Sequence, residues 1–197
     1  MKIYLASTSP RRHQLLANAG FTFEVVSPDT DELERKGETP RSMVRRLAKE
    51  KAEAGLLKVR GKKSGVLISA DTTVVSPDKK RVLNKPATAD EAKRMLRTIS
   101  GRTHTVLTGY TILFFSRGQV MKRHTTVVKT SVRMRRLTSR EIARYVASGE
   151  PMDKAGAYGA QGIGMCLIES INGSYSNVVG LPIAELVTDL ERKFNVR

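Results

Sequence analysis

Asp71 is the residue whose surroundings point most clearly to chemistry. It interrupts the run from Val66 to Val75, which is otherwise uncharged and rich in β-branched residues. Burying an unpaired carboxylate in such a strand is costly, so Asp71 needs either a cation beside it or a position at a cleft. It could cap a turn at the strand end or form a structural ion pair. We favour a functional role, as a general base or a magnesium ligand.

Lys51 is a candidate partner for such a carboxylate. It falls on the inward face of an expected helix, among apolar side chains. These are Val44, Leu47, Ala48 and Ala52. The Lys51 ammonium group either reaches back to the surface, which is the commoner outcome for a lysine, or points into a cleft toward an anion.

The segment from Ser7 to Arg12 is a candidate phosphate cradle. A strand is expected to end at Ala6, and Ser9 followed by Pro10 is typical of a helix start. Free backbone N–H groups and the helix dipole favour an anion at such a junction. Hydroxyl and guanidinium groups would complete the cradle, because arginine can bind phosphate oxygens in a bidentate manner. They belong to Ser7, Ser9, Arg11 and Arg12. The alternative is an ordinary helix start with exposed arginines.

Two further groups of charged residues could complete a site. Four carboxylates lie in the loop before the Lys51 helix, and any of them could supply a second oxygen ligand for a hard cation. They are Asp29, Asp31, Glu32 and Glu34, and most of them are expected to be simply solvated. Lys85 precedes Pro86 at the end of an expected hairpin, where it is either a triphosphate contact or an ordinary loop lysine.

A glycine-rich stretch from Asp153 to Gly162 would allow a ligand to approach the backbone closely. It matches neither the dinucleotide-binding fingerprint nor the Walker A pattern. By itself it could equally be a flexible connector.

The composition is that of a folded and strongly basic protein. The 197 residues are 40% apolar, and 35 Lys and Arg against 19 Asp and Glu leave a net charge of +16. The length suits one α/β unit, built of two lobes. The excess positive charge attracts anions, so phosphates and acidic surfaces are plausible partners.

Several classes of site are excluded by what the sequence lacks. One cysteine, Cys166, and three well-separated histidines supply neither an internal disulfide nor a zinc site of His and Cys ligands. Any metal would therefore need carboxylate ligands. No apolar run approaches the roughly 18 residues of a membrane span, and the N-terminal segment turns polar before a signal peptide could develop. We expect a cytoplasmic protein with no membrane partner.

The elements that must position these residues alternate between strands and helices. Capping boxes at Thr88–Glu91 and Thr138–Glu141 start two of the expected helices. The other predictions are strands at Ile3–Ala6, Phe21–Val25 and Gly65–Val75; helices from Pro10 to Gly20 and from Pro40 to Gly55; a hairpin return at Arg81–Leu83; antiparallel strands between Thr103 and Met134 with a turn at Arg117–Gly118; and a last helix from Pro182.

Taken together, these segments resemble the Maf family of nucleoside triphosphate pyrophosphatases. Seven motifs occur in the order typical of that family, nearly from end to end of the chain. They are Ser7-x-Ser-Pro-Arg-Arg12, Leu47-Ala-x-x-Lys51-Ala, Ala70-Asp-Thr72, Lys85-Pro86, Ser100-Gly-x-Thr-His104, Asp153-Lys-Ala-Gly-Ala-Tyr-Gly-x-Gln161-Gly and Gly173-Ser-Tyr-x-Asn-Val-Val-Gly-Leu-Pro182. The resemblance implies a single domain over residues 1–197 with two lobes, a mixed twisted sheet flanked by helices and a central cleft, similar to inosine triphosphate pyrophosphatases.

The resemblance also implies an activity, which is hydrolysis of a nucleoside triphosphate between the α and β phosphates with a divalent cation. The aspartate matching Asp71 is taken in the family as the proton acceptor for the attacking water, and the positions matching Glu32, Lys51 and Lys85 also serve the site. We therefore expect Mg²⁺ or Mn²⁺ held by Asp71 and Glu32. Homodimers occur in the family.

The branch of the family that acts on dTTP and UTP is marked by an arginine, a threonine and a glutamine. These match Arg11, Thr72 and Gln161. A glutamine amide can complement the N3–H donor and the carbonyl acceptor of uracil or thymine. We expect dTTP and UTP, with modified pyrimidine nucleotides as related substrates.

Three alternatives stay open at this stage. One is 7-methyl-GTP as the substrate. The second is a nucleic-acid-binding protein, suggested by basic clusters at residues 58–63, 79–81 and 133–136, although no specific nucleic-acid signature is present. The third is a regulator of cell division without catalysis, as opposed to an enzyme that cleans or controls the nucleotide pool.

Overall fold

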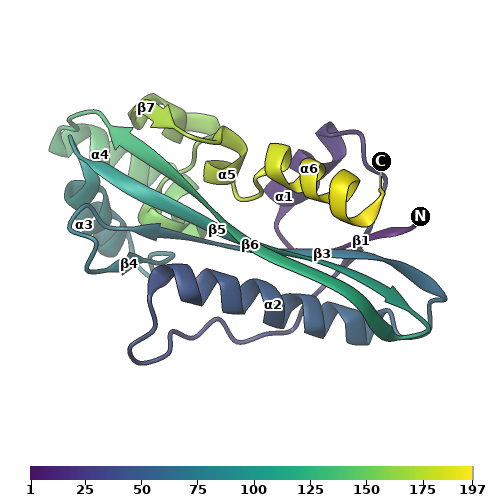
Figure 1. Ribbon diagram of the computed structural model, residues 1–197. Coiled ribbons are helices and arrows are strands. Elements are labelled where there is room, and N and C mark those ends of the chain that lie inside the picture. The colour runs from purple at the N-terminus through teal and green to yellow at the C-terminus, as the bar shows by residue number, and fades with distance from the viewer. Residues whose placement is uncertain (197) are drawn as a thin grey trace. The chain divides into compact units, whose positions relative to one another are not determined.

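The computed structural model describes residues 1–196 as an α/β fold (Figure 1). The strands are β1 Ile3–Ala6, β2 Glu24–Val26, β3 Ser64–Val75, β4 Val82–Leu83, β5 Thr103–Ser116, β6 Gln119–Met134 and β7 Ile168–Asn172. The α-helices are α1 Pro10–Asn18, α2 Pro40–Lys58, α3 Ala89–Ile99, α4 Ser139–Ala147, α5 Tyr175–Val179 and α6 Ile183–Phe194, and short 3₁₀ turns cover Glu150–Asp153, Ala155–Ala157 and Gly162–Leu167. None of the helices formed by residues 1–196 is long and apolar enough to cross a membrane.

The strands form a mixed sheet in the order β2-β1-β3-β5-β6-β7, and β4 pairs with β3. β1 runs parallel to both β2 and β3, whereas β4 is antiparallel to β3 and β7 is antiparallel to β6. The expected turn between the two long strands is confirmed, because Arg117 and Gly118 both adopt positive φ there. The mixed sheet and its flanking helices confirm the predicted fold class.

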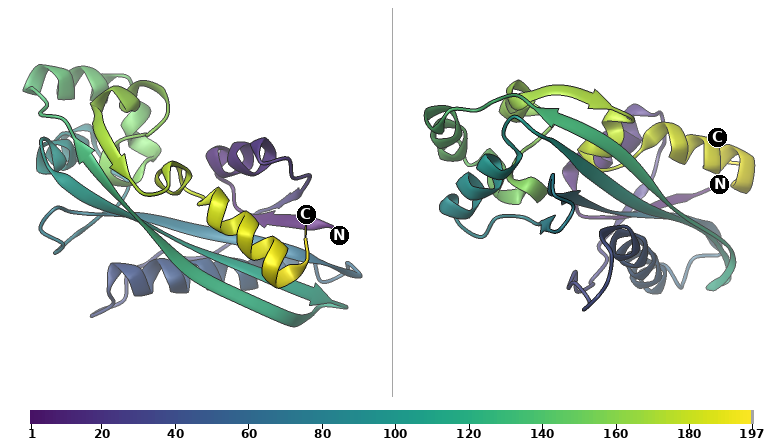
Figure 2. Two further views of the ribbon diagram at one scale, coloured as in Figure 1. Left: turned by 45° about the horizontal axis from the view of Figure 1, so that its top comes forward. Right: turned by 60° about the vertical axis from the view of Figure 1, so that its left-hand side comes forward.

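The chain divides into two compact units, which are described separately. Unit 1 comprises residues 1–71, 108–128 and 180–196, and unit 2 comprises residues 72–107 and 129–179. In unit 1, neighbouring residues of each strand enter two different cores, one on each face of the sheet. Ile3 and Leu5 pack with α1 and α6, whereas Tyr4 and Ala6 pack with α2. Both views of Figure 2 show α2, in blue, and α6, in yellow, on opposite sides of these strands. A strand buried on both faces reads as an uninterrupted apolar run, as β1 does.

Two glycines allow α2 to lie unusually close to the sheet of unit 1. A Cβ atom at Gly109 would meet the carbonyl oxygen of Val44 at 2.3 Å, and one at Gly55 would meet the Cβ atom of Ala6 at 2.7 Å. We expected Gly55 to end the helix, which was wrong, since α2 continues to Lys58. The glycine serves close packing there.

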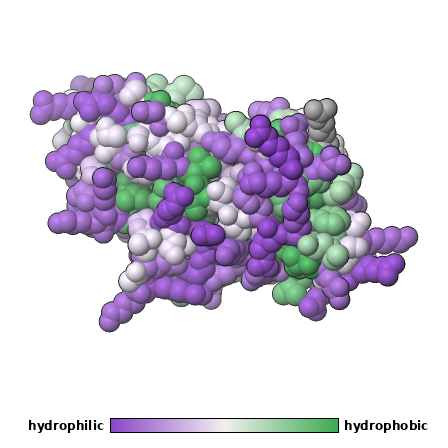
Figure 3. Space-filling view, viewed as in Figure 1, coloured by the Kyte–Doolittle hydropathy of each residue, from purple (hydrophilic) through white to green (hydrophobic). Residues whose placement is uncertain are grey.

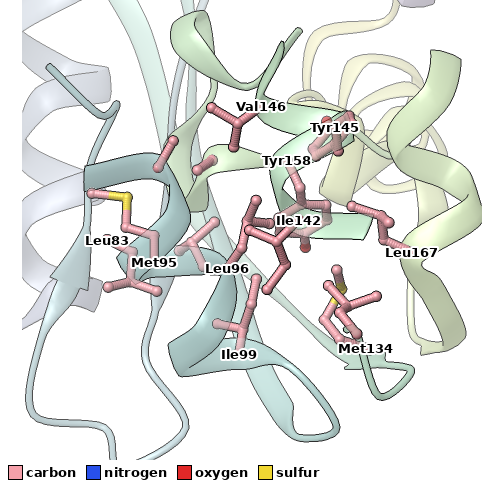
Figure 4. Packing of buried hydrophobic residues seen from close by; sticks show 14 of the residues in the cluster. Leu83, Met95, Leu96, Ile99, Met134, Ile142, Tyr145, Val146, Tyr158 and Leu167 are labelled. Carbon is pink, nitrogen blue, oxygen red and sulfur yellow. The ribbon is translucent and has the colours of Figure 1, made fainter. Parts of the chain in front are cut away.

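Unit 2 has its own core, formed mainly by α3, α4 and the strands beside them. Figure 4 shows Leu96, Ile99, Ile142 and Tyr145 converging in this core. The capping box of α4 is complete, because the Thr138 hydroxyl accepts from the Glu141 N–H and the Glu141 carboxylate accepts from the Thr138 N–H. At α3 only half of the box forms. The Thr88 hydroxyl accepts from Glu91 N, but the Glu91 carboxylate accepts from Ala87 N instead of Thr88 N.

The second expected strand is shorter and later than the sequence predicts. We expected Phe21–Val25, but only Glu24–Val26 pairs with β1, in the register Tyr4 to Glu24. Phe21 and Phe23 instead pack against the core next to α1 and α6. Their apolar character therefore reflects burial outside the sheet.

Candidate active site

The centre of the site is a cluster of two carboxylates on one lysine, all within unit 1. The Lys51 Nζ atom lies 2.7 Å from Asp71 Oδ1 and 2.6 Å from Glu32 Oε1. Lys51 is 6% exposed and Asp71 is 5% exposed, so this contact is shielded from bulk water. The lysine neutralises part of a charge that the strand could not otherwise bury. Lys51 was a candidate partner for the Asp71 carboxylate, and the structure shows this ion pair.

The secondary structure explains why these groups meet. Asp71 follows Ala70 on β3, and Lys51 projects from the α2 face that packs on the same sheet. A hydrogen bond of 2.6 Å from Ser69 Oγ to the Ala48 carbonyl joins the strand to the helix one turn before Lys51. Ser69 therefore fixes where the lysine stands relative to Asp71. No role in positioning Lys51 was predicted for this serine from the sequence.

The loop before α2 supplies one of its four candidate carboxylates to the cluster. Glu32 reaches Lys51, whereas Asp29 forms an ion pair of 2.8 Å with Lys58. Asp31 and Glu34 are exposed. Glu32 keeps about half of its side chain exposed, so it borders solvent while it contacts the buried lysine.

Ser7 and Arg12, two residues of the predicted phosphate cradle, lie together at the start of α1. Ser7 is buried, and its hydroxyl accepts from Ser9 N at 3.2 Å. The Arg12 Nε atom donates to the Gly180 carbonyl at 2.8 Å, which orients the guanidinium. Burial lowers the pKa of Arg12, while the carboxylates of Asp71 and Glu32 act in the opposite direction. An arginine remains charged throughout, so a cation stands near the two carboxylates.

Ser9 differs from the expectation in one respect. We expected its side chain to cap α1, but it makes no capping hydrogen bond. The first turn is held instead by the Ser9 carbonyl, which accepts from Arg12 N and His13 N. Arg11 lies beside Arg12 and is half-buried.

The remaining predicted residues belong to unit 2. Thr72 follows Asp71 directly in β3, and Lys85 is exposed just after β4. Gln161 is half-buried in extended backbone between two 3₁₀ turns. Lys85 and Gln161 stand on neighbouring loops, because Gly156 N donates to the Asn84 carbonyl at 3.3 Å. Within residues 1–196, no hydrogen bond joins the Lys85 and Gln161 side chains.

The donor set fits a divalent cation that is shared with a substrate. No group of three or more His, Cys, Asp or Glu side chains suited to a metal occurs among residues 1–196. Asp71 and Glu32 nevertheless present two carboxylates to one point, the Lys51 ammonium. Magnesium commonly binds one or two carboxylates and takes its other ligands from phosphates and water. The pair therefore suits a metal that arrives with a triphosphate.

A separate shallow groove of about 530 Å³ lies in unit 1 beside α6. Tyr110, His124, Asp189 and Lys193 are among its lining residues, and none of the predicted site residues lines it. Asp189 already accepts from Tyr110 at 2.6 Å and contacts Lys193 at 2.7 Å. These contacts join β5 to α6, so we assign this groove a structural role.

Comparison with known proteins agrees with the ordered motifs. The profile of the family described as "Maf-like protein" matches residues 2–193. A protein of Shewanella oneidensis named "dTTP/UTP pyrophosphatase" is 48% identical over 192 residues, covering 94% of each chain. A protein of Syntrophotalea carbinolica with the same name is 47% identical over 197 residues, covering 99% of this chain and 86% of the relative.

Among solved structures, a "Nucleoside-triphosphatase / dITP/XTP pyrophosphatase" from Mycobacterium abscessus is similar with a TM-score of 0.41 and 16% identity, over 99% of this chain and 97% of that chain. Membership is established by the family profile and by the relatives that share nearly half of the residues. The chain belongs to the family of Maf-like proteins.

Proposed function

We propose that this protein is a nucleoside triphosphate pyrophosphatase that hydrolyses dTTP and UTP to the monophosphate and pyrophosphate. The names of relatives that are 46 to 48% identical over more than nine-tenths of the chain support the activity and the substrates. The observation that carries the proposal is the buried contact of Asp71 with Lys51, joined by Glu32. A carboxylate held beside a buried ammonium group supports the proposal, because hydrolysis of a phosphate anhydride needs a proton acceptor and positive charge close together.

Asp71 is the proposed general base. Its carboxylate is fixed on one oxygen by Lys51, so it can orient a water molecule and accept its proton. The water oxygen then forms a bond to the α phosphorus, and the bond from that phosphorus to the oxygen that bridges the α and β phosphates breaks. Pyrophosphate leaves with the charge of the broken bond.

Cationic and hydroxyl groups are proposed to bind the phosphates. Arg12 is held by the Gly180 carbonyl, and Ser7 lies within 3.5 Å of the Arg12 guanidinium. Ser9 and Arg11 stand at the same helix start, where backbone N–H groups favour an anion. Lys51 and Lys85 supply further positive charge for the transferring and leaving phosphates.

A divalent cation, Mg²⁺ or Mn²⁺, is the proposed cofactor, with Asp71 and Glu32 as its protein ligands. Such a cation supplies charge neutralisation at the phosphates and makes a bound water more acidic. Lys51 keeps the two carboxylates together before the substrate arrives.

Arg11, Thr72 and Gln161 are the proposed specificity residues. The Gln161 amide can donate to a base carbonyl and accept from N3–H, which matches uracil and thymine. Its side chain makes no hydrogen bond to another side chain or to the backbone within residues 1–196, so both amide atoms are available.

The assembly is proposed because homodimers occur in the family that the sequence resembles, and the location because the proposed substrates are nucleoside triphosphates. We infer a homodimer in the cytoplasm, where nucleoside triphosphates are abundant, with no sequence-specific nucleic-acid partner. Light scattering during size-exclusion chromatography measures the assembly. The absence of a sequence-specific nucleic-acid partner is tested by measuring the affinity for random and defined DNA sequences over a range of salt concentrations. A weak and steeply salt-dependent affinity is expected.

The experiment that tests the activity is pyrophosphate release from a panel of nucleotides with and without Mg²⁺ or Mn²⁺. The panel contains dTTP, UTP, CTP, ITP, 7-methyl-GTP and the standard purine triphosphates. Metal-dependent turnover of dTTP and UTP is the expected result. A preference for 7-methyl-GTP would contradict the substrate assignment, and no turnover of any nucleotide would contradict the enzyme.

A further inference from the structure

The loop that carries Gln161 is held at its two ends by two side chains of unit 2 that bond to each other. Tyr145 of α4 and Glu150, in the first 3₁₀ turn, lie 2.9 Å apart, from the Tyr145 hydroxyl to Glu150 Oε1. Gly159 N donates to the Tyr145 hydroxyl at 3.0 Å. Ile163 N and Gly164 N donate to Glu150 Oε2 and Oε1 at 2.8 and 2.9 Å. The pair therefore binds the backbone two residues before Gln161 and two and three residues after it.

The loop also closes on itself at these points. A Cβ atom at Gly164 would lie 2.4 Å from the Gly159 carbonyl oxygen and 2.6 Å from the Tyr145 hydroxyl. Only glycine allows so close an approach of the two strands of the loop. A Cβ atom at Gly162 would lie 2.7 Å from Glu150 Oε2, so the carboxylate fills the space inside the loop.

The clamp itself is rooted in the core of unit 2. Tyr145 is buried among the apolar side chains seen in Figure 4, where only its hydroxyl meets polar atoms. The Lys154 ammonium donates to the Glu150 carbonyl at 2.7 Å, which fixes the backbone of the carboxylate residue as well. Burial alone would raise the pKa of Glu150, but the N–H groups of Gly164 and Ile163 and the Tyr145 hydroxyl outweigh it and lower the pKa. The carboxylate therefore stays ionised and accepts all three bonds.

We infer that Glu150 and Tyr145 are positioning residues that determine base specificity, by holding the backbone of Gly159–Gly164 so that the Gln161 amide meets the base in one orientation. This inference rests on the proposed function, because it assigns Gln161 the reading of uracil or thymine. Neither residue is proposed to touch the substrate. A glutamine on a loosely held loop would lose the directional hydrogen bonds on which discrimination between bases depends.

The variants E150Q and Y145F test this inference. A carboxamide keeps the shape of Glu150 but has one acceptor oxygen, so it cannot accept from the two backbone N–H groups and the hydroxyl as the carboxylate does. Y145F removes only the hydroxyl and keeps the ring in the core. E169Q is the matched control, because Glu169 is an exposed carboxylate of unit 2 that pairs with Arg133.

The first measurement is the ratio of kcat/KM for dTTP to that for CTP in each variant. We expect E150Q to lower this ratio about tenfold and Y145F to lower it about threefold, through a higher KM for dTTP and a kcat changed by less than about threefold. Q161A should lower the ratio at least as much, and E169Q should leave it unchanged. A structural defect alone would reduce the amount of active enzyme and leave both KM and the ratio unaltered.

The second measurement is hydrogen–deuterium exchange in residues 159–164. Exchange should be at least about tenfold faster in E150Q than in the wild-type protein, with α3 unchanged and E169Q like the wild type. If E150Q does not fold, both the kcat/KM ratio and the exchange rate are measured on Y145F.

The outcomes separate the two proposals. If the wild-type protein releases no pyrophosphate from any nucleotide, the proposed function is wrong and the role in specificity falls with it. If the wild-type protein is selective and Q161A is not, but E150Q and Y145F keep the wild-type ratio, only the clamp inference is overturned. Retained selectivity in Q161A would overturn it as well.

Discussion

The cluster at Asp71 and the loop at Gln161 are supported in different ways. Asp71 and Lys51 stand on a long strand and a long helix, and ion pairs join them. Gln161 stands on irregular backbone. That backbone is held by hydrogen bonds that its neutral N–H groups donate to Tyr145 and Glu150. Charge stabilisation depends mainly on distance and shielding from water, whereas reading a base depends on the direction of hydrogen bonds. In the proposed function, regular elements serve the first task and a clamped loop serves the second.

The largest expected effect breaks the charged cluster. Asp71→Asn should lower kcat for dTTP by about 10² to 10⁴, because the amide cannot accept the proton from water. Pyrophosphate release measures this loss. Asp29→Asn is the matched control, since Asp29 forms an exposed ion pair with Lys58. Near wild-type turnover by Asp71→Asn would rule out Asp71 as the base, and a cell-division phenotype that survives the substitution would show that any regulatory role is separate from catalysis.

Removing the Lys51 ammonium group should lower the stability of the folded protein. Lys51→Met leaves the Asp71 carboxylate buried without its cation, which should cost about 3 to 5 kcal/mol in the free energy of unfolding at pH 7. Urea unfolding followed by circular dichroism measures it. Lys58→Met, which breaks an exposed pair, should cost no more than about 1 kcal/mol. Equal costs for the two variants would show that the buried cluster is not distinct in stability.

Acid should weaken unit 2 through His104. This residue is buried beside Tyr158, with 2.7 Å between its Nε2 atom and the Tyr158 hydroxyl, and burial lowers its pKa to about 4. The unfolded chain takes up a proton near the ordinary pKa of 6.5 and the folded chain does not, so this stability is complete at neutral pH and is lost from about pH 6.5 down to pH 4. The expected loss is roughly 3 kcal/mol.

Urea unfolding between pH 7 and pH 4 measures this contribution. In His104→Gln the side chain can still bond to the Tyr158 hydroxyl but does not titrate, so its stability should fall less steeply over that range. A variant with the same slope as the wild-type protein would assign the acid sensitivity to other groups.

The smallest expected effect compares the helix starts of the two units. Thr138→Ala removes the hydroxyl from the complete capping box of α4 and should cost about 1 to 2 kcal/mol. Thr39→Ala removes a single capping bond from α2 and should cost about 0.5 to 1 kcal/mol. Thermal unfolding measures both. A larger loss for Thr39→Ala would reverse the expected order.

Predictions from the sequence were most successful where local patterns determine structure. The apolar run around Asp71 and the helical face of Lys51 predicted that both side chains lie on inward-facing positions, because a period of 2 or 3.6 residues states which side chains point inward. Both Thr-x-x-Glu segments predicted helix starts, and Arg117–Gly118 predicted the turn between β5 and β6.

Predictions were weakest where a contact joins segments far apart in the chain. Nothing in the loop before α2 distinguishes Glu32 from Asp31 or Glu34, since the choice depends on which of them the folded loop brings to Lys51. A glycine such as Gly55 looks the same in the sequence whether it ends a helix or allows the helix to pack closely against a strand. Glu150 carries no periodic signal at all, because its partners are backbone N–H groups that every residue except proline possesses.

The two glycine contacts of α2 have a consequence for how this protein can change over time. Gly109 and Gly55 bring the helix against the sheet through backbone and Cβ atoms, near Val44 and near Ala6, on either side of Lys51. The close approach at the two glycines thus helps to locate the lysine, together with the hydrogen bond from Ser69 to the Ala48 carbonyl. Exposed positions of the helix can be substituted without displacing the ammonium group, and the face of the protein seen in Figure 3 is mostly hydrophilic. Substitution of either glycine, by contrast, should displace the helix and lower the activity, although every reactive group is still present in the sequence.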